Sequence, residues 1–251
     1  MNKPLAAGHH GCTGQKTCRF KNLSLEVNFQ PIVRIVEDVP TVFAYEALSR
    51  FFDASGSLFL PDVVLPALSS PEQKLLFKCV TQHVIAILAR HPDIEYISVN
   101  IQPSLLQDDL GFFVLDMLNT FGVEPSRLAL EFCEQEPIDT QKAEVIATCN
   151  SLHARGVKLF LDDIFTGYSH IQTIKRLPIS GLKIDQSVLK NLKNESHQVR
   201  DLLLRMVSAL MDSSYPIIIE GIESLEDLEL VDSTKLHYQG YYFGRPAPWK
   251  G

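Results

Sequence analysis

The sequence predicts a TIM-type (β/α)8 barrel. Short apolar runs alternate with helical stretches along the chain, and seven of these runs end in a polar residue suited to metal or phosphate chemistry. Strands that alternate with helices favour a parallel α/β arrangement, and in a TIM barrel the chemistry lies at the carboxyl ends of the strands. The residues that end the runs are Glu46, Asn100, Glu131, Asp162, Lys183, Glu220 and Gln239.

Length and composition agree with one barrel. The chain has 251 residues, of which 45% are hydrophobic, so it is long enough for a complete barrel with a full core. We expect a flexible tail at residues 1–20 and one barrel domain at residues 21–251. The formal charge of −7 argues against binding of a nucleic acid polymer. An anionic substrate then needs local positive charge from metal ions, Arg50 or Lys183.

The sequence shows no signal peptide, because its first residues lack an apolar core, and no apolar stretch approaches the length of a membrane span. The five cysteines are an odd number and are expected to be reduced thiols. We therefore expect a cytoplasmic protein without a membrane partner. In the tail, a metal site and a flexible end are both open interpretations, and the cysteine spacing is not a standard zinc spacing. The residues concerned are His9, His10, Cys12 and Cys18.

The expected elements follow in order from residue 21. Strands are expected at about 25–35 and 43–48, and further strands end at residues 100, 131, 163, 183, 220 and 239. Helices are expected at about 70–91, 104–121, 140–155 and 196–211, with short helices before Pro178 and after Ser224. The first helix has Ser70 as its expected N-cap and Pro71 at its first position.

The chain stops just after the last expected strand, where a complete barrel has a covering helix. The sequence therefore leads us to expect a barrel whose final helix is missing or truncated. We expect the N-terminal segment or another subunit to close that face, or the chain to be cut short of its last helix.

The polar strand ends predict a metal centre. In a barrel these carboxylates converge on one mouth, where divalent cations relieve their mutual repulsion. Hard cations such as Mg²⁺ and Mn²⁺ prefer oxygen ligands, and two of them can bind a phosphodiester and activate water.

Eight blocks of residues stand in a fixed order between about residues 25 and 248. The blocks are Gln30-Pro31, Glu46-Ala47-Leu48 with Arg50, Val99-Asn100, Glu131-Phe132-Cys133-Glu134, Asp162-Asp163 with Thr166-Gly167-Tyr168-Ser169, Lys183-Ile184-Asp185, Glu220-Gly221-Ile222-Glu223, and Gln239-Gly240 with Arg245-Pro246. Together they resemble the motifs of EAL-domain cyclic di-GMP phosphodiesterases, over nearly the whole domain.

The resemblance implies a role for each matching residue. One metal ion would be held by Glu46, Asn100, Glu131 and Asp162, and a second would be bridged by Asp162 and held mainly by Asp163. Lys183 would orient water or stabilise negative charge, and Glu220 would act as general base or as a second-metal ligand. The substrate contacts would be Gln30, Leu48, Arg50 and Gln239. The loop-bracing residues would be Glu134, Thr166 and Gly167. Asp185 and Glu223 are expected to be structural.

The sequence departs from the family pattern at three positions. Phe165 stands where the family has a glycine in the loop after the aspartate pair, and this change puts activity and dimer coupling in question. Cys133 replaces a usual threonine and Gln102 a usual serine.

The leading hypothesis is a metal-dependent phosphodiesterase that hydrolyses cyclic di-GMP to linear pGpG. It would use two Mg²⁺ or Mn²⁺ ions, with Ca²⁺ non-productive. The alternative is a catalytically impaired EAL-like receptor for cyclic di-GMP or a protein-interaction module, and a weaker one is a hydrolase of another phosphodiester. The resemblance also implies a homodimer, and an unidentified protein partner remains open. The sequence identifies no pathway.

Overall fold

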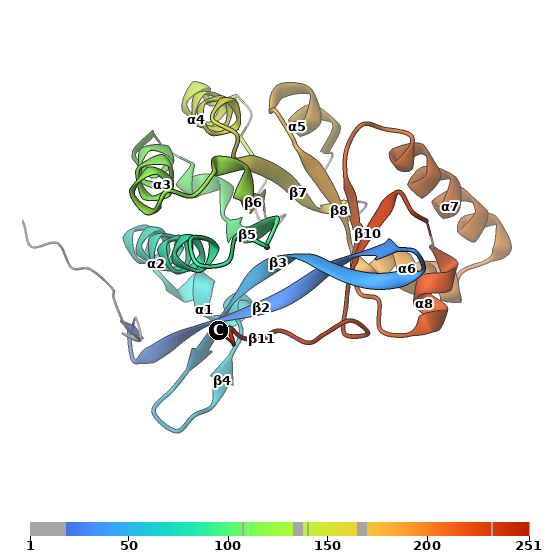
Figure 1. The fold of residues 1–251 in the computed structure, drawn as a ribbon, viewed down its shortest axis with the longest axis horizontal. Coiled ribbons are helices and arrows are strands. Elements are labelled where there is room, and N and C mark those ends of the chain that lie inside the picture. Colours follow the sequence, from blue (N-terminus) through green and yellow to red (C-terminus); the bar gives the residue numbers. More distant parts are fainter. Residues whose placement is uncertain are drawn as a thin grey trace, which may run out of the picture.

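The computed structural model is a closed barrel with helices on its outside (Figure 1). It describes residues 19–106, 108–132, 138–139, 141–164, 170–231 and 233–250. Within these residues the closed ring runs β2, β10, β9, β8, β7, β6, β5, β3 and back to β2. The strands are β2 (Leu23–Val36), β3 (Val39–Phe52), β5 (Tyr96–Ile101), β6 (Leu128–Phe132), β7 (Lys158–Ile164), β8 (Gly181–Ile184), β9 (Ile217–Ile219) and β10 (Leu236–Gln239). The predicted TIM-type barrel is confirmed.

One strand breaks the expected parallel arrangement. β2 runs antiparallel to both of its neighbours, β3 and β10, whereas the other neighbours in the ring are parallel. Its link to β3 is a tight turn in which Glu37 and Asp38 both have positive φ, 51° and 63°. A parallel crossover needs a dozen or more residues, so this short connection forces a hairpin. The parallel arrangement that the sequence favours therefore holds for the rest of the ring but not for β2.

The helices cover the outer face of the parallel strands (Figure 1). They are α1 (Pro61–Val64), α2 (Ser70–Leu88), α3 (Asp108–Phe121), α4 (Ala143–Ala154), α5 (His170–Arg176), α6 (Gln186–Asn194), α7 (His197–Met211) and α8 (Leu225–Leu230). Three 3-10 turns are η1 (Leu65–Ala67), η2 (Pro103–Leu105) and η3 (Pro125–Arg127). The sequence reading missed α1 and α6.

The start of α2 also differs from the prediction. Its N-cap is Ser69 rather than Ser70, and the carboxylate of Glu72 accepts hydrogen bonds from the backbone N and the Oγ of Ser69 at 2.8 and 2.6 Å. Because glutamate at the third helical position can complete a capping box, it moves the start by one residue.

A plug of apolar side chains fills the barrel interior, drawn from Ile32, Phe43, Ala44, Tyr96, Ala129, Phe160 and Ile218. The ring of Tyr96 packs edge-on against Phe160, with centroids 5.5 Å apart. A Cβ on Gly181 would lie 2.7 Å from the Phe160 ring, so β8 has a glycine where this ring needs room. Since the interior is packed, the polar residues at the strand ends form a site at the mouth rather than a channel.

The C-terminal segment closes the face that the sequence left open. A short strand, β11 (Ala247–Pro248), pairs antiparallel with β2, and Trp249 packs edge-on against Phe29 and Tyr45 with centroids 5.2 Å away in both cases. The Trp249 indole N–H donates to Nε2 of His91 at 3.2 Å. This segment therefore covers part of the outer face of β2 and β3.

Two further short strands extend the β2–β3 hairpin: β1 (Arg19–Phe20) pairs with β2, and β4 (Leu58–Phe59) pairs with β3. Arg19 and Phe20 thus belong to the sheet, although the sequence placed them in the tail. The tail residues His9, His10, Cys12 and Cys18 lie outside the described residues. Among the helices that the structure describes, none combines the length and the apolar character that crossing a membrane requires.

Candidate active site

The seven strand-end residues meet at one mouth of the barrel. β3 carries Glu46 in mid-strand, because that strand continues to Phe52 as part of the hairpin. β5, β6, β7, β8 and β10 carry their residue at or near the last position, and Glu220 directly follows β9. Lys183 and Glu131 are fully buried, and Glu46 and Gln239 are nearly so.

Lys183 stands at the centre of the cluster, with its Nζ close to four carboxylates. The distances are 2.5 Å to Glu220, 2.9 Å to Glu131, 3.3 Å to Glu46 and 3.3 Å to Asp162. Each partner comes from a different part of the ring, so the lysine joins both sides of the barrel through its ammonium group.

Glu46 also receives two amide hydrogen bonds. Asn100 Nδ2 donates to its Oε1 at 2.8 Å, and Gln239 Nε2 donates to its Oε2 at 2.6 Å. Gln239 Nε2 also lies 3.2 Å from the Oε1 of Gln30, whose own amide donates to the backbone oxygen of Gly244 at 3.4 Å. A buried polar network of this kind fixes the orientation of each member.

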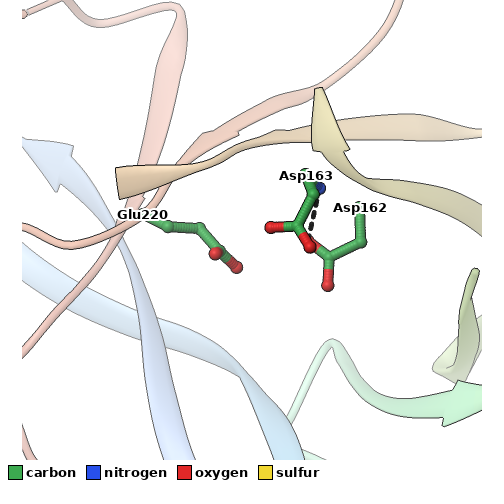
Figure 2. Close-up of side chains that lie close together, drawn as sticks. All are labelled: Asp162, Asp163 and Glu220. Carbon is green, nitrogen blue, oxygen red and sulfur yellow. Dashed lines mark hydrogen bonds between the residues drawn. The ribbon is translucent and has the colours of Figure 1, made fainter. Parts of the chain in front are cut away.

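A β-bulge lets two consecutive aspartates face the same site. Neighbouring residues in a strand normally point to opposite faces. Between Leu161 and Ile164 the pairing of β7 with β8 shifts register, and Asp163 has a left-handed φ of 55°. The carboxylates of Asp162, Asp163 and Glu220 then converge, each offering one oxygen within 4.8 Å of the others (Figure 2). The Asp163 backbone N–H donates to Oδ1 of Asp162 at 3.0 Å.

Burial raises the pKa values of three of these carboxyls. It raises the pKa of Glu131 to about 8, against the opposing attraction of Lys183. Burial also raises the pKa of Asp162 and places that of Glu220 well above its usual range, although Lys183 again opposes the change. Repulsion by the Glu46 carboxylate adds to each rise.

Two groups keep their charge. Burial would raise the pKa of Glu46, but Lys183 and the hydrogen bonds from Gln239 and Asn100 outweigh it and hold the pKa below its usual value. Burial would lower the pKa of Lys183, but the surrounding carboxylates, with Asp162 first, hold it well above its usual value. The lysine is therefore a permanent cation and not a proton acceptor near neutral pH.

The donor set fits divalent cations. Among the described residues, no group donates a hydrogen bond to the buried Oε1 of Glu131 or to the buried Oε1 of Gln239. A buried oxygen that accepts no hydrogen bond costs stability. A bound cation would contact such oxygens and would stabilise the ionised form of the carboxyl groups whose pKa values are raised. All the candidate ligands offer oxygen or amide oxygen, which suits Mg²⁺ or Mn²⁺.

A cleft with two lobes passes over this cluster. The first lobe, about 400 Å³, lies beside α1, α2 and η2, and the second, about 270 Å³, lies beside the loops after β9 and β10. Glu46, Leu48 and Asp162 line both lobes. Arg50 lines the first lobe, and its Nη1 donates to the Ser49 backbone oxygen at 2.9 Å.

The second lobe includes Tyr241, which the sequence reading did not single out. The Arg245 guanidinium lies 4.1 Å from the centroid of its ring, and the ring is half exposed. The signal in the sequence was its place after Gln239-Gly240, next to a second tyrosine. A half-exposed aromatic ring at a polar cleft can stack on a flat ligand group.

Glycines let the loops after β9 and β10 approach each other. A Cβ on Gly240 would lie 2.0 Å from the backbone oxygen of Ile222, and one on Gly221, where φ is 74°, would lie 2.3 Å from Cβ of Gln186. The Ile222 N–H donates to the backbone oxygen of Gln239 at 3.2 Å. These contacts fix the chain directly beyond Glu220 and Gln239.

Other predicted residues have the following positions. Asp185 is the N-cap of α6 and accepts a hydrogen bond from the Ser187 N–H at 2.8 Å, which is a structural role. Glu223 lines the second lobe, and its N–H donates to Asp227 at 3.0 Å. The predicted loop residues Glu134, Thr166 and Gly167, with Cys133 and Phe165, lie outside the described residues.

We expect the metal-free domain to lose stability as the pH rises from 7 to 8. Burial raises the pKa of Glu131 to about 8, so this carboxyl holds its proton in the folded state up to near that pH, whereas it is ionised in the unfolded chain above about pH 4.5. The raised pKa values of Asp162 and Glu220 act in the same direction. The folded state then binds more protons, so the free energy of unfolding falls with pH until the folded pKa values are passed. Thermal unfolding in chelator should show a melting temperature roughly 5 °C lower at pH 8.

Between pH 7 and 8, the titration of His83 and His237 should contribute little to the change in stability. Burial lowers the pKa values of His83 and His237, so above pH 7 both are neutral whether the chain is folded or unfolded. Mn²⁺ or Mg²⁺ should raise the melting temperature and flatten its pH dependence, because a cation stabilises the ionised carboxylates. A melting temperature that rises between pH 7 and 8 in chelator would contradict the prediction.

Three comparisons place the chain among known proteins. The EAL domain family model matches residues 15–246. The chain is 29% identical over 236 residues to the probable cyclic di-GMP phosphodiesterase PdeB of Escherichia coli strain K12, and the match covers 91% of the chain and 44% of that relative. The chain thus spans less than half the length of this curated relative.

Solved structures share the barrel. The PaMucR phosphodiesterase in complex with c-di-GMP has a TM-score of 0.74 and 27% identity, with 89% of this chain and 97% of that chain covered. The EAL enzyme Bd1971, bound to cAMP and cyclic-di-GMP, has a TM-score of 0.79 at 23% identity, with 89% of this chain and 62% of that chain covered, which shows the common fold.

Proposed function

Because the chain belongs to the EAL domain family, we propose that it is a divalent-metal-dependent phosphodiesterase that hydrolyses cyclic di-GMP to linear pGpG. The observation that carries the proposal is the convergence of four carboxyl groups on one buried lysine, with Asp163 beside two of them and the two-lobed cleft passing over the cluster. The similar phosphodiesterases of Escherichia coli and PaMucR support the choice of substrate.

The proposed metal ligands are those that the family resemblance implies, and the oxygen donors of the site suit them. One ion would take Glu46, Asn100, Glu131 and Asp162, and a second would take Asp162 and Asp163. Two such ions supply charge neutralisation for the phosphate and a nucleophile at neutral pH. Glu220 shares the Asp162–Asp163 cluster, and this grouping favours its role as a second-metal ligand over that of a general base.

The protein's own groups bind the substrate and stabilise charge. Lys183 keeps its proton, so it donates hydrogen bonds and balances the negative charge that develops on the phosphate oxygens. Arg50 suits a phosphate of the dinucleotide, since a guanidinium binds phosphate oxygens in pairs. Gln239 and Gln30 form an ordered amide pair that would hold water or substrate beside Glu46.

The direct experiment is incubation with cyclic di-GMP and each metal in turn, with pGpG followed by chromatography. We expect turnover with Mg²⁺ or Mn²⁺ and at least about tenfold less with Ca²⁺, because Ca²⁺ takes more ligands at longer distances and misplaces the reacting groups. Chelator should abolish turnover. Equal rates with Ca²⁺ and Mg²⁺, or full activity in chelator, would overturn the two-metal proposal.

The same assay separates the alternative function. A catalytically impaired receptor would bind cyclic di-GMP in calorimetry and form no pGpG with either metal. The convergence of the metal-ligand residues favours the enzyme. The departure at Phe165, which suggested the receptor, lies outside the described residues. A homodimer remains a proposal by the same resemblance, and a location in the cytoplasm remains a proposal from the sequence alone. Sedimentation of the purified chain tests the first.

A further inference from the structure

Gln102 follows β5 directly and lines the first lobe of the cleft. It lies two residues beyond Asn100, and residues two apart along an extended chain share a face. Asn100 lines the same lobe and donates to Glu46, so Gln102 stands on the metal-site side of the barrel mouth but further along the lobe.

The side-chain oxygen of Gln102 has no hydrogen-bond partner within the described residues, although its backbone oxygen accepts from the Leu105 N–H at 2.9 Å. The residue occupies the N-cap position of η2, yet its side chain makes no capping hydrogen bond. Its Oε1 is buried and accepts no hydrogen bond. A buried acceptor without a donor costs stability, so this glutamine is a poor choice for structure alone.

The surroundings suit a flat group with a polar edge. The first lobe is lined mainly by apolar side chains, among them Leu60, Leu65, Leu76 and Phe77. Gln73 also lines it, but its amide already donates to the Leu65 backbone oxygen at 2.9 Å. An apolar pocket with few polar groups binds a ring by burial and selects its edge by hydrogen bonding.

We propose that Gln102 binds the edge of one guanine base of the substrate in this lobe. The inference rests on the proposed function, which supplies the guanine. Guanine has N–H donors at N1 and at its exocyclic amino group, and the free Oε1 is an acceptor. The last side-chain torsion of glutamine is broad, so rotation of the amide presents this oxygen to the lobe.

The test is binding of cyclic di-GMP by calorimetry in Ca²⁺, together with thermal unfolding of the ligand-free protein. Gln102→Leu should weaken binding about tenfold. It should also leave the melting temperature unchanged or raise it by roughly 2–4 °C, because it removes an unpaired buried acceptor. Gln102→Glu should retain binding within about threefold at pH 8, since its carboxylate still accepts from guanine.

Gln73→Leu is the matched control in the same lobe. It should lower the melting temperature, because it breaks the bond to the Leu65 oxygen, and should weaken binding less than Gln102→Leu does. Unchanged affinity in Gln102→Leu, or a fall in its melting temperature with no change in affinity, would overturn the inference. Binding does not require turnover, so a wild-type protein that binds but forms no pGpG refutes the proposed function alone.

Discussion

Replacing Asp162 by alanine should abolish pGpG formation and leave the domain folded and about as stable as the wild type. Asp162 lines both lobes and is the proposed bridge between two metal ions, so its loss should lower kcat by about a thousandfold or more. Burial, with a smaller contribution from the Glu46 carboxylate, raises the pKa of Asp162, so its removal takes away a group whose ionised form the folded site disfavours. The lost acceptor for the Asp163 N–H offsets part of that gain.

Two variants control this experiment. Asp162→Asn keeps the shape and an acceptor for the Asp163 N–H but removes the charge, and it should be equally inactive. Asp227→Ala is the same substitution at a carboxylate bound by Lys193 at 2.5 Å and by Ser224, whose pKa these partners lower. It should lower stability by roughly 2 kcal/mol, chiefly because the capping hydrogen bonds at the start of α8 are lost, and keep kcat within about tenfold.

Chromatography of the products and chemical denaturation, both at pH 8, measure the two effects on each protein. Turnover of Asp162→Ala near the wild-type rate at saturating metal would remove it from the metal centre. A collapse of its stability in chelator would show that the residue is structural.

Most residues of the candidate site could be predicted from the sequence, because they are polar residues at the ends of apolar runs. A polar residue that closes an apolar run has no place in a packed interior, and parallel strands deliver such residues to the same mouth. The structure brings together the residues that this pattern singled out, from Glu46 to Gln239. Their roles stay predictions, because position alone does not separate a ligand from a base.

Other features depended on local backbone that the pattern does not encode. The turn at Glu37-Asp38 lacks the glycine or asparagine that usually marks such a hairpin, so the antiparallel β2 was not foreseen. The bulge at Asp163 needs a positive φ at a residue that is not glycine. Two adjacent aspartates in the sequence do not predict that conformation.

The missed helix and the covering segment have another cause. α6 begins directly after its N-cap, Asp185, and ends just before Ser196, the N-cap of α7. The stretch between β8 and β9 therefore holds two helices, and only the longer one was expected. β11, which pairs with β2, is only two residues long, so it shows no periodic pattern in the sequence. The packing of Trp249 against Phe29 and Tyr45 holds it in place. Contacts between distant segments decide such elements.

Replacing Lys183 by methionine should remove activity and destabilise the metal-free domain in a pH-dependent way. Methionine keeps an unbranched chain but removes the cation that lies within 3.3 Å of four carboxylates. Breaking a buried ion pair by removing one partner typically costs about 3–5 kcal/mol, because the remaining charge is uncompensated. We expect a loss of that size at pH 8 in chelator.

The cost should shrink toward pH 5. Without Lys183 the pKa values of Glu131, Asp162 and Glu220 rise further, since the attraction of its ammonium group is what chiefly opposes the effect of burial on them. The folded variant therefore takes up protons that the unfolded chain lacks between pH 5 and 8, and its stability increases as the pH falls. Mn²⁺ should restore stability at pH 8 without restoring turnover, because a cation replaces the charge but not the lysine's hydrogen bonds to substrate.

Lys193→Met is the matched substitution, at a partly exposed lysine that pairs with Asp227 outside the cleft. It should reduce stability far less than Lys183→Met and retain turnover, since a partly solvated pair contributes little. Denaturation curves at pH 5 and 8, with and without Mn²⁺, give the comparison. If Lys183→Met were as stable as the wild type at pH 8 in chelator, the lysine would not be the counter-ion of the cluster, and pGpG formation by this variant would refute its proposed role in the reaction.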